Sequence, residues 1–255
     1  MVTVDVLVGP RLKIERANRH IEELARMTDP LSREFYTVAV ERRACYPDDN
    51  TPGSYLNYYP LKPIPETLAV IIGDTVHNLR CALDHTASAI IRTKDPRAEP
   101  HFPMFKEREK LEGAKWLAAI EEALPGSRRM FLENVRPEGG ANDHLWRFND
   151  LSNTDKHNLL IPTVTLVAVN GINADVGGRR FQNLGSGGNA AHPIGIIAWT
   201  YAQGQIAMDQ NFKAAVQIKF GAGTPFEDEP VIPTLLQMSD LVSETLNAFE
   251  RLITA

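Results

Sequence analysis

The sequence has little cysteine, little net charge and no long hydrophobic run. Its 255 residues include only two cysteines, Cys45 and Cys81, too few for a disulfide framework, which favours a reducing compartment. The formal net charge of −5 is spread along the chain without a basic tail or stripe, so indiscriminate binding to nucleic acid is not supported. No apolar run approaches the ~20 residues that span a bilayer, and the first residues lack the pattern of a secretory signal. We therefore expect a cytoplasmic protein with no membrane partner.

The pattern that is present predicts an α+β fold, in which a helical bundle of about four main helices is joined to an antiparallel β-sheet. We expect residues 1–255 to form a single α+β unit. Its mainly helical part is predicted at about 10–30, 64–158 and 230–255, and its β-rich part at about 35–60 and 159–222. The glycine cluster at 184–188 lacks the strand before it and the helix after it that a phosphate loop needs, so we expect a flexible hairpin or mobile loop there. We expect the protein to bind no cofactor.

One stretch, GDTVHNLRCALDH from Gly73 to His85, concentrates polar residues in a single expected helix. Wound at 100° per residue, the helix over 68–90 separates into two faces. The apolar face is predicted to carry Leu68, Ile72, Val76, Leu79, Leu83, Ala87 and Ile90. The polar side and its flank carry the candidate site residues Asp74, His77, Asn78, Arg80, Asp84 and His85. We expect this side to face a helix over 142–158, which adds Asp155 and His157.

Two resemblances attach to these residues. The run HNLR-ALDH, from His77 to His85, and the triplet Asp155-Lys156-His157 resemble the pattern of a family of uncharacterised bacterial proteins, and this likeness covers much of the first 160 residues. The spacing R-x4-H of Arg80 and His85 also resembles that of the HEPN superfamily of helical bundles. Many HEPN members look like metal-independent ribonucleases.

The HEPN resemblance implies particular roles for these residues. His85 would transfer a proton at the ribose 2′-hydroxyl, which only RNA has, and Arg80 would stabilise charge on the attacked phosphate. Asp84 or Asp155 would orient His85. The resemblance also implies a homodimer, because two HEPN protomers commonly bring their motifs together, and it implies RNA or a nucleotide as the ligand. The remaining binding residues would be Asp74, His77, Asn78, Asp155 and His157.

The chain also departs from the HEPN pattern. Cys81 follows the arginine, where that superfamily usually has a polar residue, and a large appended sheet is not usual there. Side chains five positions apart on a helix diverge by about 140°. Arg80 and His85 would therefore meet only through their long side chains, through a kink or across a second protomer.

Two further interpretations remain open for the same residues. A histidine and carboxylate metal site would use His77, Cys81 and His85, which follow one another at i, i+4 and i+8 on one helix. Asp74 or Asp84 would add oxygen ligands, and His157 would come from the next helix. An architectural network would instead pair Arg80 with Asp84, because buried polar groups must be hydrogen-bonded. This network between the two helices would contain Asp74, His77, Arg80, Asp84, Asn153, Asp155 and His157. In that case the chain would be a non-catalytic binding or scaffold protein.

Overall fold

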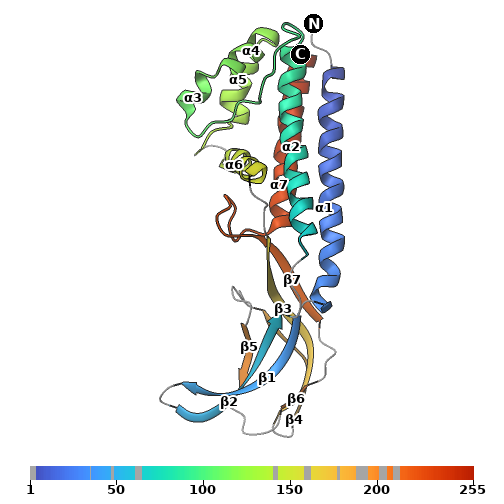
Figure 1. Cartoon of the computed structure of the whole chain (residues 1–255), viewed down its shortest axis with the longest axis vertical. Helices are drawn as coiled ribbons and strands as arrows, with labels where there is room; N and C mark the ends of the chain where they lie inside the picture. Colours follow the sequence, from blue (N-terminus) through green and yellow to red (C-terminus); the bar gives the residue numbers. More distant parts are fainter. Residues whose placement is uncertain are drawn as a thin grey trace. The chain divides into compact units, whose positions relative to one another are not determined.

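The computed structural model describes residues 4–34, 36–46, 49–60, 65–139, 143–157, 162–176, 179–187, 195–200, 206–208 and 213–255. The chain divides into two units, each assembled from segments that are far apart in the sequence (Figure 1). The helical unit contains Met1–Leu24, Glu66–Ile161 and Phe220–Ala255, and the strand-rich unit contains Ala25–Pro65 and Pro162–Lys219. The expectation that all residues form a single α+β unit stays a prediction.

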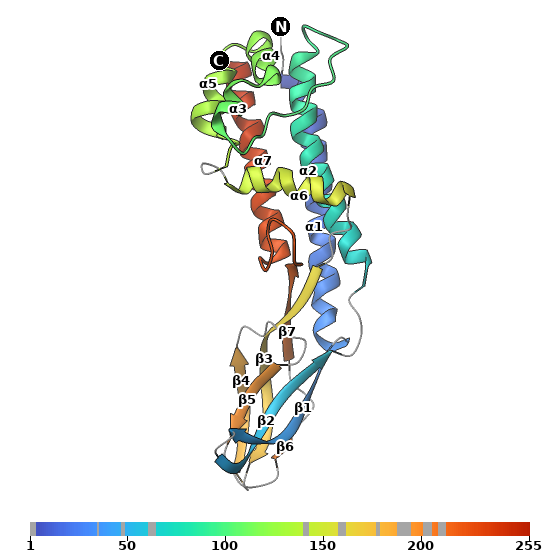
Figure 2. The same ribbon diagram turned by 60° about the vertical axis from the view of Figure 1, so that its left-hand side comes forward.

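Long helices make up most of the helical unit. After a short 3-10 helix, η1 (Val4–Leu7), these are α1 (Val8–Glu34), α2 (Thr67–Ile91), α6 (Asp143–His157) and α7 (Val231–Thr254). The part of α1 that belongs to this unit lies beside α2 and α7, and α6 crosses α2 and α7 (Figure 2). The predicted helical bundle is confirmed. None of the described helices is long and apolar enough to cross a membrane.

The core of this bundle is built from the apolar faces of its helices. On α2 the predicted apolar face is buried, and its members Leu68, Ile72, Val76, Leu79, Leu83, Ala87 and Ile90 are at most 1% exposed. Three phenylalanines from different segments, Phe102, Phe131 and Phe249, lie in mutual ring contact with centroids 5.0 to 6.4 Å apart. Burial of such apolar surface is the main favourable contribution to folding.

Short helices between α2 and α6 complete the helical unit. They are α3 (Arg108–Glu112), α4 (Lys115–Ala123), α5 (Ser127–Met130) and the π-helix η2 (Phe131–Val135). Gly126 separates α4 from α5 with φ of 90°, a left-handed backbone conformation that glycine adopts without a steric penalty. The last two short helices, α5 and η2, lie along α7.

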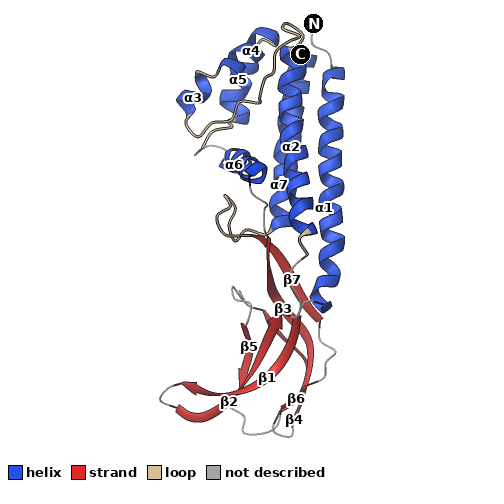
Figure 3. Ribbon diagram, viewed as in Figure 1, coloured by secondary structure: helices blue, strands red, loops and turns tan. Residues whose placement is uncertain are grey.

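Strands make up most of the second unit (Figure 3). The hairpin of β1 (Tyr36–Tyr46) and β2 (Asp49–Pro60) pairs antiparallel, and β2 pairs antiparallel with β5 (Gly195–Thr200). In a second sheet, β3 (Pro162–Val176) pairs antiparallel with β4 (Arg179–Gly187) and β6 (Ile206–Met208), and β7 (Lys213–Phe220) also pairs with β3. One sheet was expected mainly from residues 159–222, whereas the structure places β5 from that range beside the early hairpin.

Candidate functional site

The polar side of α2 divides into two groups that point to different neighbours. Arg80 and Asp84 contact the extended segment that contains Phe102 and Met104. Asp74, His77 and Cys81 lie on the side where α6 brings Asp155 against α2. The predicted site residues therefore do not converge on one centre.

The first group is a cluster formed by Arg80, Asp84 and Phe102. The Arg80 guanidinium donates to both carboxylate oxygens of Asp84, from Nε at 3.1 Å and from Nη2 at 2.9 Å. Its Nη2 also donates to the Phe102 carbonyl at 3.2 Å, while the Phe102 N–H donates to Asp84 Oδ1 at 2.8 Å. Both backbone polar groups of Phe102 are thus satisfied by one ion pair, which fixes the segment of Phe102 against α2.

Burial dominates the electrostatics of this cluster. The Arg80 side chain is only 9% exposed, and that of Asp84 is 25% exposed. Burial lowers the pKa of Arg80 from its ordinary value, and the charge and hydrogen bonds of Asp84 act in the opposite direction. The arginine nevertheless stays charged at neutral pH, because its ordinary pKa is so high. Its side chain has internal partners and little access to a ligand.

His85 lies apart from this cluster. It is exposed, and it forms no hydrogen bond or ion pair with any residue that the structure describes. Arg80 instead takes Asp84, Phe102 and the Met104 sulfur as its partners. The structure therefore does not bring Arg80 and His85 together as a hydrogen-bonded pair, in keeping with their divergence on a regular helix.

The second group forms where α6 approaches α2. A Cβ atom at Gly73 would lie 2.5 Å from Asp155 Oδ1, so the absence of a side chain at Gly73 makes room for this carboxylate. Burial raises the pKa of Asp155, while the charge of His77 lowers it and that of Asp74 raises it. The predicted neighbourhood of Asp74, His77 and Asp155 is thereby found between the two helices that were expected to supply it.

The remaining predicted residues add little chemistry to this second group. Asn78 donates to the Asp74 carbonyl of its own helix at 2.8 Å. Cys81 Sγ lies 3.4 Å from His77 Nε2, but burial raises the pKa of this thiol, which disfavours the reactive thiolate. The described residues contain no group of three or more histidine, cysteine or acidic side chains that could hold a metal ion. The side chain of His157, the remaining ligand of the predicted metal site, lies outside the described residues.

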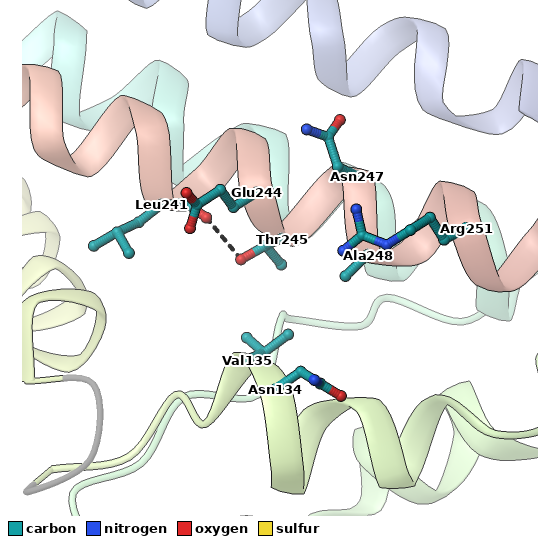
Figure 4. Close-up of a pocket in the computed structure, with 8 residues that line it drawn as sticks. All are labelled: Asn134, Val135, Leu241, Glu244, Thr245, Asn247, Ala248 and Arg251. Atoms are coloured by element: carbon teal, nitrogen blue, oxygen red, sulfur yellow. Dashed lines mark hydrogen bonds between the residues drawn. The ribbon is translucent and has the colours of Figure 1, made fainter.

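A cavity elsewhere in the helical unit was not predicted from the sequence. We call it the α7 groove: it has a volume of about 360 Å³ and lies between α7 and η2, with Asn134 on one wall and Glu244 and Arg251 on the other (Figure 4). Val135, Leu241 and Ala248 give it an apolar lining. A second cavity of about 410 Å³ continues from it and shares Asn134 and Arg251.

Three of the polar side chains that line the α7 groove have no partner in the described part of the chain. Among the residues that the structure describes, none forms a hydrogen bond or ion pair with the side chain of Asn134, Glu244 or Arg251. Asn247, also on this wall, already accepts a hydrogen bond from Arg11 at 3.1 Å. No motif could have revealed the groove, because Asn134 and Arg251 are brought together only by the packing of η2 on α7.

The wall that carries Asn134 is held in place by a carboxylate. Glu121, near the end of α4, accepts hydrogen bonds from the Gly126 N–H at 3.0 Å, the Arg128 N–H at 2.7 Å and the Ser127 hydroxyl at 3.1 Å. These contacts satisfy donors at the beginning of α5, which leads directly into η2. The groove is therefore built on an anchored turn.

Comparison of the chain with family models, with curated proteins and with solved structures found no match. The likeness to HEPN proteins consequently stays a prediction.

Proposed function

We propose that this protein is a non-catalytic binding protein, in which the dense polar stretch of α2 serves the architecture of the helical unit. The observation that carries the proposal is the pairing of Arg80 with Asp84 and with both backbone groups of Phe102. An arginine used in this way is a structural element. It holds a segment without regular secondary structure against the central helix.

The energetics favour this interpretation over a phosphate clamp. To contact a phosphate, Arg80 would have to leave Asp84 and the Phe102 carbonyl. Breaking a buried ion pair of this kind costs about 3–5 kcal/mol, because one charge is left without compensation. Binding through side chains that have no internal partner carries no such cost, which directs attention to the α7 groove.

A HEPN-like, metal-independent RNA-cleaving module is the second candidate, and one observation favours it. His85 is exposed and unengaged by the described residues, so it is free to meet a ligand or a second copy of the chain. In this alternative, Arg80 of a second protomer would have to leave its own partners, Asp84 and the Phe102 carbonyl, to meet His85. The alternative requires RNA cleavage that depends on His85.

An RNA cleavage assay separates these two candidates. Purified full-length protein is incubated with a mixed RNA pool in EDTA beside His85→Ala and the control His101→Ala, in which another exposed histidine is removed. We expect no cleavage by any of the three proteins. Cleavage by the native protein and by His101→Ala, together with loss of cleavage in a folded His85→Ala variant, would overturn the non-catalytic proposal and establish the ribonuclease.

A further inference from the structure

The charges in the α7 groove have a defined spacing. Glu244 and Arg251 are seven residues apart on α7, so they lie on one face of the helix, and their Cα atoms are about 10 Å apart along its axis. Both line the groove. One end of the groove therefore offers a carboxylate and the other a guanidinium, neither of which is neutralised by a described side chain.

The lining between these charges has mixed character. Asn134 faces α7 from η2, and its amide can both donate and accept a hydrogen bond. Val135 and Ala248 supply small apolar surfaces. A volume of about 360 Å³ lies at the lower end of the range of small-molecule sites.

These features select a ligand by length and charge. A single amino acid carries its ammonium and carboxylate on the same carbon, and so it cannot reach both ends. An extended chain advances about 3.3–3.6 Å per residue, so three residues span about 10 Å. The amide groups of such a chain would pass Asn134.

We infer that the α7 groove binds a short zwitterionic peptide of about three residues, with its free amino end at Glu244 and its free carboxyl end at Arg251. The inference rests on the proposed binding function. The guanidinium and the terminal carboxylate can form a bidentate pair, and Glu244 accepts hydrogen bonds from the ammonium group. The apolar lining favours small apolar side chains.

Calorimetric titration of the full-length protein with unblocked trialanine tests the inference. We expect saturable binding of trialanine and no measurable binding of alanine, which is too short. Acetylation of the amino end or amidation of the carboxyl end should each weaken binding by about tenfold or more, because each removes one of the two charge-assisted contacts.

Variants then assign each end of the peptide. In Arg251→Gln, the free and the amidated peptide should bind equally weakly, whereas Arg19→Gln, an exposed arginine of α1 paired with Glu15, should bind as the native protein does. In Glu244→Gln, acetylation of the peptide should have no further effect. Absence of trialanine binding, or equal binding of blocked and unblocked peptides, would overturn the inference. Neither result bears on the RNA assay, so failure of this inference is distinguishable from failure of the proposed function.

Discussion

Two arginines of the helical unit, Arg80 on α2 and Arg251 on α7, have opposite surroundings. Arg80 is buried and bonded to Asp84, to the Phe102 carbonyl and to the Met104 sulfur. Arg251 is exposed at the edge of a cavity and has no side-chain partner among the described residues. The arginine in the conspicuous motif is thus used by the fold, while the arginine outside any motif is available to a ligand.

This contrast shows that the density of polar residues in a sequence does not by itself reveal which of them lack partners within the fold. Buried polar groups have to be hydrogen-bonded, and a helix that packs on several neighbours needs many of them. A ligand, in turn, can bind readily only to polar groups that are not already hydrogen-bonded within the protein. The two arginines differ in whether the fold already supplies hydrogen-bond partners for the guanidinium group. Tertiary packing determines this property.

The largest effect is expected from Arg80→Met, which removes the cation and leaves the carboxylate of Asp84 and the carbonyl of Phe102 without their partner. We expect the free energy of unfolding to fall by about 3 kcal/mol, because one charge of a buried pair becomes uncompensated. Urea unfolding followed by circular dichroism measures this loss. The control Arg129→Met removes an exposed arginine paired with Glu133 and should leave the unfolding midpoint unchanged. Equal behaviour of the two variants would show that the Arg80 cluster does not stabilise the fold.

The helical architecture could largely be predicted from the sequence. Apolar spacing on α2 gave the correct buried face, since helical periodicity directly reflects which side meets the core. The pairing of the strands could not be predicted in the same way. Alternation within a strand shows which residues share a face, but it carries no information on which distant strand is its neighbour, and β5 therefore pairs with β2 unexpectedly.

The next effect concerns the wall of the α7 groove. Burial by itself would raise the pKa of Glu121. Hydrogen bonds from the N–H groups of Arg128 and Gly126 and from the Ser127 hydroxyl lower the pKa by more than burial raises it, so it lies below its ordinary value. A lowered folded-state pKa stabilises the fold above the unfolded-state pKa, and this contribution is lost as the pH falls through the folded-state value. Glu121→Gln should cost about 1–2 kcal/mol at pH 7, since the amide replaces a charged acceptor.

The pH dependence of that cost makes the test specific. Urea unfolding of native protein and Glu121→Gln should differ most at pH 7, and the difference should shrink once the pH falls below the ordinary glutamate pKa of 4.5. Glu122→Gln, an exposed neighbour, should match the native protein at every pH. A cost for Glu121→Gln that does not change with pH would show that the carboxylate charge does not anchor the turn.

The candidate site was predicted only in part, for a physical reason. The neighbourhood of Asp74, His77 and Asp155 follows from placing two polar helix faces together, which the sequence pattern allows. Outside their own helix, Arg80 and Asp84 bond to the backbone of Phe102. Nearly every residue has the same backbone groups, so a sequence does not indicate which of them will be the partner. The α7 groove is still less visible, because it depends on a π-helical turn and on residues about a hundred positions apart in the chain.

A smaller effect tests the contact between α2 and α6. Gly73→Ala would gain about 0.5–1 kcal/mol in an unhindered helix, but here the new Cβ would meet the Asp155 carboxylate at 2.5 Å. We therefore expect Gly73→Ala to be neutral or destabilising in the native background and stabilising in Asp155→Ala. Urea unfolding of the four proteins of this double-mutant cycle gives the coupling energy, which should be about 1 kcal/mol. Additive effects would mean that Asp155 does not lie against Gly73 in solution.

The smallest effect is expected from Arg251→Ala and Glu244→Ala, which remove the charged ends of the α7 groove. Neither side chain has a described partner, so no hydrogen bond is broken and no buried charge is exposed. Arg251 lies in the last turn of α7, where its charge interacts favourably with the helix dipole, and its loss should cost no more than about 0.5 kcal/mol. Urea unfolding of Arg251→Ala and Arg80→Met in parallel compares the loss in free energy of unfolding that each substitution causes. A cost for Arg251→Ala close to that for Arg80→Met would mean that the fold uses Arg251 as well, and the distinction between an engaged and an available arginine would fail.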